Sequence, residues 1–201
     1  VYMTLSVLKP LPERQFASGM AEILKHGLIK NGEYFQWLLE NQRAIRSHEM
    51  DVLLPMIEES CKIKRAVVEQ DPTEQGERAL LNFGHTIGHG VEKLKNFSMS
   101  HGECVAIGTA AASYLSWKQG LISEKDLVYI CEGLKEFGLP VRTDGLSAGE
   151  VLKATKSDKK MDAGSIKFVL LRHIGDAFVE RTLTDEELLE AIRWILGEAI
   201  I

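Results

Sequence analysis

Apolar residues recur at helical spacing along most of this chain. In the first such segment, which begins at Glu13, apolar positions and one glycine fall at i, i+3, i+4, i+7 and i+8 over residues 20–28, so they share one helix face. Capping-box spacing at Ser147–Glu150 and Thr184–Glu187 predicts two helices near the end of the chain, the second running to about Ile195. The periodicity predicts further helices at Glu33–Arg46, His48–Glu69, Glu77–Lys95, Glu103–Gln119 and Ser123–Phe137.

Two stretches have the pattern of β structure instead. Val1–Leu8 is short, apolar and rich in strand formers, and it ends at a proline-containing turn, which predicts a strand. Ile166–Arg172 and Ala177–Arg181 are β-rich runs separated by a segment containing Gly175, which predicts a hairpin. The chain is therefore predicted to be mostly α and multi-helical, with a small β-hairpin.

Composition excludes some classes of protein. The 201 residues, 45% of them hydrophobic, suffice for one sizeable domain that needs neither a disulfide nor a metal merely to fold. A balance of 24 Lys and Arg against 29 Asp and Glu gives a net charge of −5, which argues against a nucleic-acid-binding domain. A net negative charge does not exclude a local basic pocket that binds a small anion.

Cysteine usage and the lack of long apolar stretches bear on location. Cys61, Cys104 and Cys131 are odd in number and widely spaced, which favours a reducing compartment over a disulfide framework. The apolar stretches are far shorter than the roughly 18 residues of a membrane span, and no secretory leader pattern is visible. We therefore predict a cytoplasmic protein that does not enter the membrane.

The segment from Arg78 to His89 carries the most informative polar residues. On a continuous helix, at about 100° per residue, four of them would share a stripe roughly 40° wide opposite an apolar face. They are Arg78, Asn82, His85 and His89. Gly84 and Gly88 lie one turn apart on the apolar side, and each costs a helix interior about 1 kcal/mol relative to alanine. The pair therefore predicts close approach of another helix backbone.

Several of these side chains are candidate metal ligands. His85 and His89, at i and i+4, can both reach one metal ion, although surface or hydrogen-bonded histidines are commoner at this spacing. The lack of a glutamate directly after His85 argues against a zincin protease. His101, at a predicted helix start, and Glu22, one turn before Lys25, are further candidates. Their simpler interpretations are a loop histidine and a surface ion pair worth about 0.3 kcal/mol.

Four segments together resemble the C-terminal domain of the 3-dehydroquinate synthase family, enzymes of the shikimate pathway and of aromatic amino acid biosynthesis. The segments are LPERQFASGMAEILKHGLI, CKIKRAVVEQDPTEQGERALLNFGHTIGH, HGECVAIG and the DKK within Ser157–Lys160. They follow the family's order and cover nearly all of the chain.

The resemblance implies a role for each matched polar residue. Glu22, His85 and His101 would bind a catalytic Zn²⁺ or another divalent metal such as Co²⁺, with positions left open for substrate. His89 would position substrate and move protons, and Lys25 would join it in the catalytic group. The residues implied to bind substrate phosphate, carboxylate or hydroxyls are Lys25, Lys64, Arg78, Asn82, His89 and one of Lys159 and Lys160.

The family's reaction converts a phosphorylated small molecule, 3-deoxy-arabino-heptulosonate 7-phosphate, to 3-dehydroquinate and phosphate. NAD⁺ oxidises one hydroxyl transiently, phosphate leaves by elimination, hydride returns, and an intramolecular aldol step closes the ring. The resemblance thus implies a carbon–oxygen lyase that depends on NAD⁺ and zinc and forms a homodimer.

Enzymes of this family also have an N-terminal α/β domain that binds NAD⁺ in a Rossmann-like manner. No glycine-rich strand–turn–helix fingerprint is visible here, and few residues precede Glu13. We therefore expect the N-terminal NAD-binding domain to be absent, with residues 1–12 a remnant of the connection from it and residues 13–201 the helical zinc- and substrate-binding domain. On this interpretation the chain alone has little or no synthase activity.

Three alternatives remain at this point. Other sugar-phosphate cyclases, such as 2-deoxy-scyllo-inosose and valiolone-type synthases, share the zinc constellation, and metal-dependent polyol dehydrogenases have similar helical domains. A non-catalytic helical domain would bind a partner and hold no metal. His26, four residues after Glu22, is a possible competing ligand.

Overall fold

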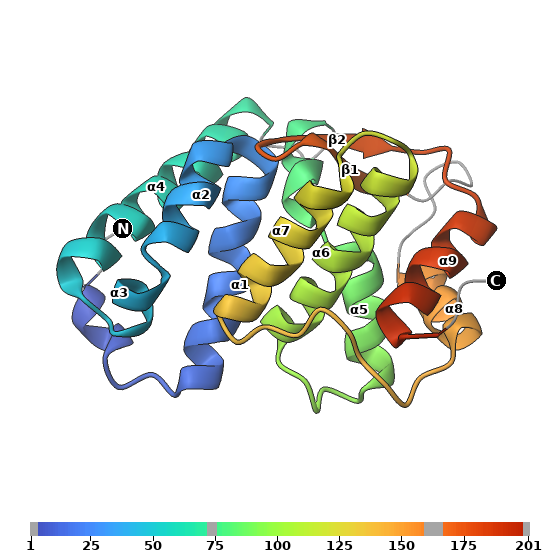
Figure 1. Cartoon of the computed structure of the whole chain (residues 1–201), viewed down its shortest axis with the longest axis horizontal. Helices are drawn as coiled ribbons and strands as arrows, with labels where there is room; N and C mark the ends of the chain where they lie inside the picture. Colours follow the sequence, from blue (N-terminus) through green and yellow to red (C-terminus); the bar gives the residue numbers. More distant parts are fainter. Residues whose placement is uncertain (1–3, 72–75, 159–166, 199–201) are drawn as a thin grey trace.

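The computed structural model describes residues 4–71, 76–158 and 167–198. Within them, helices pack side by side and a two-stranded hairpin lies across one end of α6 and α7 (Figure 1). The α-helices are α1 Glu13–Lys30, α2 Gly32–Glu40, α3 Gln42–Arg46, α4 Met50–Gln70, α5 His85–Leu94, α6 His101–Lys118, α7 Glu124–Glu136, α8 Ala148–Asp158 and α9 Asp185–Leu196. The other described elements are the 3₁₀ helices Leu5–Leu8 and Glu77–Asn82 and the strands β1 Phe168–His173 and β2 Asp176–Glu180. The predicted fold class, mostly α with a small hairpin, is confirmed.

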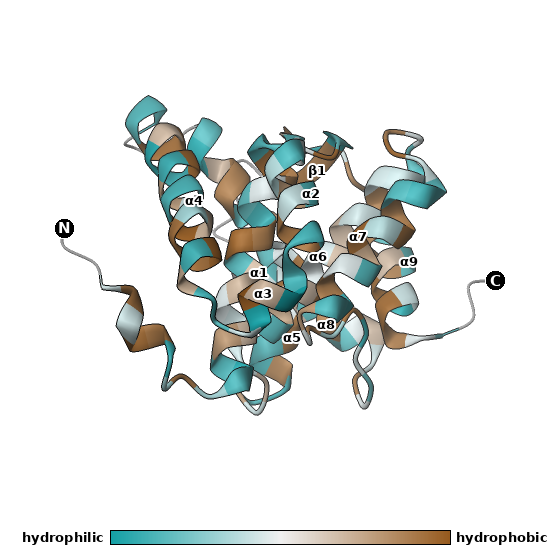
Figure 2. Cartoon of the chain, turned by 60° about the vertical axis from the view of Figure 1, so that its left-hand side comes forward, coloured by the Kyte–Doolittle hydropathy of each residue, from teal (hydrophilic) through white to brown (hydrophobic). Residues whose placement is uncertain are grey.

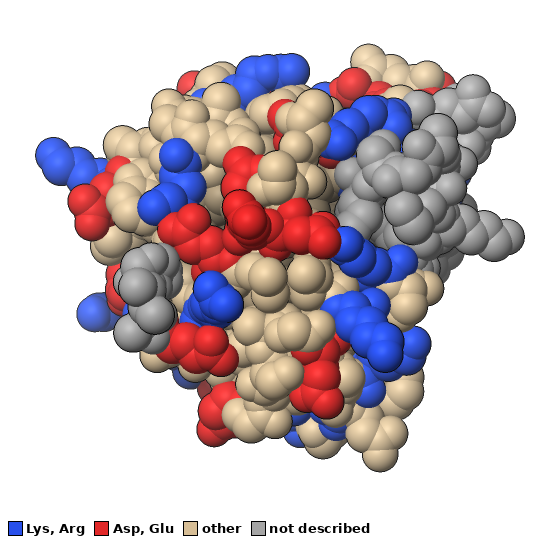
Figure 3. All heavy atoms as spheres, turned by 90° about the vertical axis from the view of Figure 1, so that its right-hand side faces the viewer, with Lys and Arg blue, Asp and Glu red and all other residues tan. Residues whose placement is uncertain are grey.

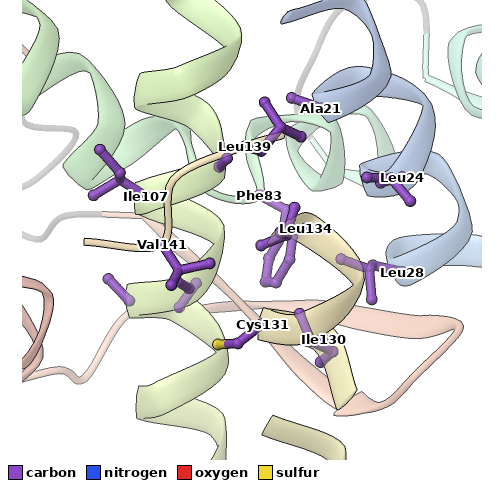
Figure 4. Packing of buried hydrophobic residues seen from close by; sticks show 14 of the residues in the cluster. Ala21, Leu24, Leu28, Phe83, Ile107, Ile130, Cys131, Leu134, Leu139 and Val141 are labelled. Atoms are coloured by element: carbon purple, nitrogen blue, oxygen red, sulfur yellow. The ribbon is translucent and has the colours of Figure 1, made fainter. Parts of the chain in front are cut away.

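Helix α6 forms the centre of the bundle because its residues are apolar or small on every side. All residues from Gly102 to Ser116 except Glu103 are buried, and a helix of this kind must be covered all round. Helices α1, α5, α7 and α9 and strand β1 pack against it. Figure 4 shows Phe83, the residue two positions before α5, among core side chains of α1, α6 and α7.

Peripheral helices bury one face only. Along α4 the buried residues are Leu53, Met56, Ser60, Ile63 and Val67, at helical spacing. Its ribbon accordingly alternates between hydrophilic and hydrophobic residues in Figure 2. This alternation is the periodicity on which the helix prediction rested.

The described surface carries charges of both signs. On the face that includes α8 and α9, a band of acidic side chains crosses the middle and basic side chains lie on either side of it (Figure 3). The described residues of this face thus do not form the continuous basic surface typical of nucleic-acid-binding proteins. No helix among the described residues is long and apolar enough to cross a membrane.

The hairpin is antiparallel, with Leu170 opposite Phe178 and a bulge between Leu171 and His173. It is joined to the bundle by two hydrogen bonds: the Leu171 N–H donates to Ser116 Oγ at 3.0 Å, and the Gly175 N–H donates to the Leu28 carbonyl at 2.8 Å. Gly175 has φ +99°, a conformation that favours glycine. The predicted hairpin is confirmed, with the other strand bounds shifted by one residue; Ile166, the predicted start of the first strand, lies outside the described residues.

The predicted continuous helix over Glu77–Lys95 is wrong. A 3₁₀ helix ends at Asn82, Phe83 and Gly84 form a turn in which Gly84 adopts φ +80°, and α5 begins at His85. The 40° stripe from Arg78 to His89 therefore does not exist as one helix face. The fully buried Phe83 ring turns into the core here, and a left-handed glycine permits the reversal that a helix would not.

Three smaller predictions also need correction. Leu5–Leu8 is a 3₁₀ helix, because no described strand offers it a pairing partner; Val1–Met3 lie outside the described residues. The helix predicted over Glu33–Arg46 divides at Asn41. His48 has φ +55°, so α4 begins two residues later, at Met50.

The helix starts predicted from capping-box spacing and the predicted close helix contact at Gly88 are confirmed. Thr184 and Glu187 form a full capping box, and Ser147 Oγ accepts a hydrogen bond from the Glu150 N–H at 3.3 Å. An alanine Cβ at Gly88 would lie 2.8 Å from the Cys104 carbonyl oxygen of α6, so the predicted close helix approach is confirmed.

Candidate metal and substrate site

Glu22, His85 and His101 come together from three helices. Glu22 lies near the middle of α1, His85 is the first residue of α5 and His101 is the first residue of α6. The Glu22 Oε1 atom is 3.5 Å from His85 Nε2 and 3.9 Å from His101 Nε2. One carboxylate oxygen and two imidazole nitrogens thus face a common point.

Each of these two imidazoles is held by its other nitrogen. His85 Nδ1 lies 3.2 Å from the Phe83 carbonyl oxygen, which can only accept a hydrogen bond. His101 Nδ1 lies 3.3 Å from Glu92 Oε2. With both Nδ1 atoms protonated, both Nε2 lone pairs point toward Glu22, the arrangement that metal-binding histidines use.

Close backbone contacts set the positions of these helices. The Gly102 N–H donates to Ser18 Oγ at 3.0 Å, and a Cβ at Gly102 would collide with the Ser18 backbone. Ser18 precedes Glu22 by about one turn, so this contact brings Glu22 beside His101. An ion pair from Arg14 to Glu103, with N–O distances of 2.9 and 2.6 Å, also joins the start of α1 to the first turn of α6.

Lys25 and Glu22 form an ion pair inside the protein. Lys25 is 2% exposed, and its Nζ lies 2.6 Å from Glu22 Oε2. Burial alone would raise the pKa of Glu22, but the charge and hydrogen bond of Lys25, with a smaller contribution from His85, bring that pKa below its ordinary value. Burial lowers the pKa of Lys25 more than Glu22 raises it. The interpretation of this pair as a surface ion pair is therefore wrong.

The protonation state of His85 suits a metal ligand. Burial, followed by the positive charge of Lys25, lowers the pKa of His85 to about 4. At neutral pH its imidazole is therefore uncharged and its Nε2 lone pair is free to bind a metal.

The donor set fits a divalent cation. Glu22 Oε1 is buried and accepts no hydrogen bond from any described residue, an arrangement that is costly unless another group satisfies it. A carboxylate oxygen and two imidazole nitrogens are donors that Zn²⁺ prefers, and three protein ligands leave positions open. The buried oxygen thus marks a place where Glu22, His85 and His101 would hold a metal.

His89 lies at the same place. Ligand atoms of His85, His89 and His101 all lie within 4.8 Å of one another, and the His89 ring centroid is 5.2 Å from that of His85 and 5.8 Å from that of His101. His89 is close enough either to bind the metal or to contact a substrate beside it. The division of roles between His89 and the three predicted ligands stays a prediction.

The other predicted substrate-binding residues lie on α4, on the 3₁₀ helix before α5, or outside the described residues. Lys64 is exposed on α4, and its positive charge helps to lower the pKa of Lys25. Arg78 and Asn82 are half-buried on the 3₁₀ helix that leads into Phe83. Lys159 and Lys160 lie outside the described residues.

His26 is not part of the cluster, whereas Glu92, which the sequence did not indicate, contacts it. His26 is buried one turn further along α1, where its Nδ1 lies 2.7 Å from Ser60 Oγ of α4, and among the described residues the histidines whose ligand atoms meet are His85, His89 and His101. Glu92 was not singled out by sequence, although it lies at i+7 from His85 on α5. That spacing, which places it on the same helix face, was the available signal.

Comparisons with known proteins identify the family of this chain. The family model for the 3-dehydroquinate synthase C-terminal domain matches residues 19–161. A 3-dehydroquinate synthase from Acetivibrio thermocellus is 37% identical over 98% of this chain and 55% of its own length. One from Shewanella halifaxensis is 40% identical over 96% of this chain and 54% of its own length. The chain spans about half the length of these curated relatives.

Solved structures of related cyclases share the fold. The 2-epi-5-epi-valiolone synthase of Streptomyces hygroscopicus subsp. jinggangensis, solved with NAD⁺ and Zn²⁺ bound, has 26% identity and a TM-score of 0.87 over 95% of this chain and 54% of its own. A 2-deoxy-scyllo-inosose synthase, solved with carbaglucose-6-phosphate, NAD⁺ and Co²⁺, has 21% identity and a TM-score of 0.82 over 96% of this chain and 55% of its own, and supports the fold alone. The family match and the curated relatives show that this chain belongs to the 3-dehydroquinate synthase C-terminal domain family.

Proposed function

We propose that this chain is the metal- and substrate-binding part of a 3-dehydroquinate synthase, a carbon–oxygen lyase that converts 3-deoxy-arabino-heptulosonate 7-phosphate to 3-dehydroquinate and phosphate. The observation that carries the proposal is the convergence of His85 and His101 on the buried, unsatisfied Oε1 atom of Glu22. The 37–40% identity to synthases of this name supports it.

Two cofactors complete the proposal. Glu22, His85 and His101 would hold Zn²⁺ or Co²⁺, and we assign most of the NAD⁺ contacts to the half of the relatives' length that this chain does not span. When bound, the metal would polarise substrate hydroxyl oxygens, and NAD⁺ would accept a hydride and return it.

The chain's own residues then bind and orient the substrate. Lys25, Lys64 and Arg78 would neutralise its carboxylate and phosphate, because ammonium and guanidinium groups are the usual partners of such anions. Asn82 would hydrogen-bond a substrate hydroxyl, and one of Lys159 and Lys160 would contact phosphate. His89, beside His85 and His101, would position substrate and move a proton.

The choice of substrate within the superfamily rests on sequence similarity. The named 3-dehydroquinate synthases are 37–40% identical to this chain, against 26% for the valiolone synthase. Retention of both Asn82 and His89 also favours the heptulosonate substrate.

A chimera tests the activity. This chain would replace the matched half of the Acetivibrio thermocellus synthase, and release of phosphate and formation of 3-dehydroquinate would be measured with NAD⁺ and Zn²⁺ present. We expect turnover of the heptulosonate phosphate and none of glucose 6-phosphate. Loss of turnover in His85→Ala but not in His173→Ala, an exposed histidine of β1, would complete the expected pattern. Preferential turnover of glucose 6-phosphate would overturn the substrate assignment.

Metal content tests the site without the chimera. The unsubstituted chain, purified without chelator or histidine tag, should contain about one zinc ion per molecule. His85→Ala should lose it and His173→Ala should keep it. Equal metal content in all three proteins would show that the zinc is held elsewhere.

A further inference from the structure

Glu92 contacts the candidate metal site from behind His101. It lies on α5, seven residues after His85, and its side chain is 17% exposed. Its Oε2 atom is 3.3 Å from His101 Nδ1, while His101 Nε2 faces Glu22 on the opposite edge of the ring. The imidazole of His101 thus lies between two carboxylates that come from different helices.

His101 needs such a partner more than His85 does. His85 is 13% exposed and its Nδ1 is held by a main-chain carbonyl, whereas the His101 side chain is 46% exposed at the first position of α6. An imidazole at an exposed helix start is free to rotate and to place its proton on either nitrogen. A carboxylate at Nδ1 restricts both choices, because it accepts a hydrogen bond only from a protonated Nδ1.

The charges around Glu92 leave it available for this contact. Lys95, the residue that follows α5, donates instead to the Asp144 carbonyl at 2.8 Å and lies 3.3 Å from the Asp144 carboxylate. Cys104, on the facing helix α6, is buried, and burial, followed by the nearby carboxylates, raises the pKa of its thiol to about 12, so it adds no negative charge.

We propose that Glu92 is a positioning residue for the divalent cation: its carboxylate holds the Nδ1–H tautomer of His101 and aims Nε2 toward Glu22. This inference rests on the proposed metal site. Carboxylates that accept a hydrogen bond from a metal-binding histidine typically raise metal affinity by about 10- to 100-fold, so we expect Glu92→Gln to weaken metal binding by about that factor.

Cobalt titration of the purified chain tests the proposal, with the visible absorption of bound Co²⁺ as the readout. The matched control is Glu150→Gln, which removes one negative charge from an exposed side chain of α8, a helix that packs against α5. We expect Glu92→Gln to bind Co²⁺ about 10- to 100-fold more weakly, and Glu150→Gln to change the affinity by much less. Equal weakening in both variants, or unchanged affinity in Glu92→Gln, would overturn the positioning role.

A second measurement needs no metal. In the chelator-treated chain, ¹⁵N NMR of the histidine rings should show the proton of His101 on Nδ1, and Glu92→Gln should move the population toward Nε2–H. A proton on Nε2 in the unsubstituted chain would contradict the proposal. If the unsubstituted chain binds no Co²⁺, both the metal site and the role of Glu92 fail; if it binds Co²⁺ and Glu92→Gln binds equally, only the role of Glu92 fails.

Discussion

Lys25 Nζ lies 2.6 Å from Glu22 Oε2, and the ammonium group that makes this contact is almost wholly buried. The other carboxylate oxygen of Glu22 faces His85 and His101. A single carboxylate therefore holds the charge of Lys25 on one side and offers a lone pair to the cluster on the other. The ion pair keeps Glu22 ionised, as a metal ligand must be.

Removing the ammonium should destabilise the chain. Lys25→Met would leave the Glu22 carboxylate without its partner, and we expect the free energy of unfolding of the metal-free protein to fall by about 1–3 kcal/mol. The cost should stay below that of a fully buried pair because the Glu22 side chain is 36% exposed. Urea unfolding in the presence of chelator measures it.

The chain offers a matched control for this substitution. Lys135 and Glu132 on α7 have the same i, i+3 separation and an N–O distance of 2.7 Å, but both are about half exposed. Lys135→Met should change stability by less than about 0.5 kcal/mol. Equal effects of the two substitutions would show that burial of Lys25 does not increase the contribution of its ion pair to the free energy of unfolding.

The contact between α5 and α6 should be sensitive to one methyl group. An alanine Cβ at Gly88 would lie 2.8 Å from the Cys104 carbonyl oxygen and 3.4 Å from Val105 Cα. Because backbone atoms cannot rotate away, we expect Gly88→Ala to destabilise the protein by about 1–3 kcal/mol and to weaken Co²⁺ binding, since the helix carrying His85 must shift. Gly149→Ala is the control, because no heavy atom lies within 4 Å of its Cβ. That variant should be neutral or up to about 1 kcal/mol more stable, and similar stability of both variants would contradict the proposed tight contact.

Sequence predicted the helices well where one apolar face repeats, as in α1, α4 and α7, because burial of that face determines both the helix and its orientation. It failed between Asn82 and His85. The residues Arg78 to His89 fit a helical period, but the preference of Phe83 for the core and the freedom of Gly84 to adopt positive φ broke the helix. His85 and His89 still lie one turn apart on α5, because the break lies before His85.

The residues alone made Glu22, His85 and His101 separate candidates, and only the family resemblance predicted that they form one site. Nothing in the sequence around Glu22 indicates that Lys25 is buried, because both residues have the spacing of a surface pair; burial comes from helices that pack onto α1 from far along the chain. Glu92 and Ser18 act through His101 and Gly102, contacts between separate helices that no local pattern contains. The hydrophobic periodicity of each helix does not predict which distant helices pack against one another.

Stability should fall with acid because of His26. This side chain is buried against Ser60, and burial, followed by the charge of Lys25, lowers its pKa to about 4 from an ordinary value of 6.5. A group whose pKa is depressed in the folded state contributes its full stability above the unfolded pKa. That contribution, about 3 kcal/mol, is lost as the pH falls from about 6.5 toward 4.

The double variant His26→Leu with Ser60→Ala isolates this contribution, because it removes both partners of the hydrogen bond and leaves no unsatisfied group. Urea unfolding between pH 4 and pH 7, with chelator present so that metal binding by His85 does not interfere, should show a shallower loss of stability in the double variant. The unsubstituted chain should lose about 3 kcal/mol more over this interval. Parallel curves for the two proteins would mean that His26 is protonated as readily in the folded state as in the unfolded one.

Substitutions of His89 and of Glu22 should differ in their effect on stabilisation of the chain by metal. A ligand that binds only the folded state stabilises it by about 2.7 kcal/mol at a concentration 100 times its dissociation constant, so Zn²⁺ should raise the unfolding temperature of the unsubstituted chain and chelator should reverse the rise. Glu22→Gln removes a predicted ligand and should abolish the rise. His89→Ala should retain most of it, since the predicted role of His89 is toward substrate, although its ring lies as near to His85 as that of His101 does. If Glu22→Gln retains the rise and His89→Ala loses it, the metal is held by the three histidines, and Glu22 serves only as the counter-ion of Lys25.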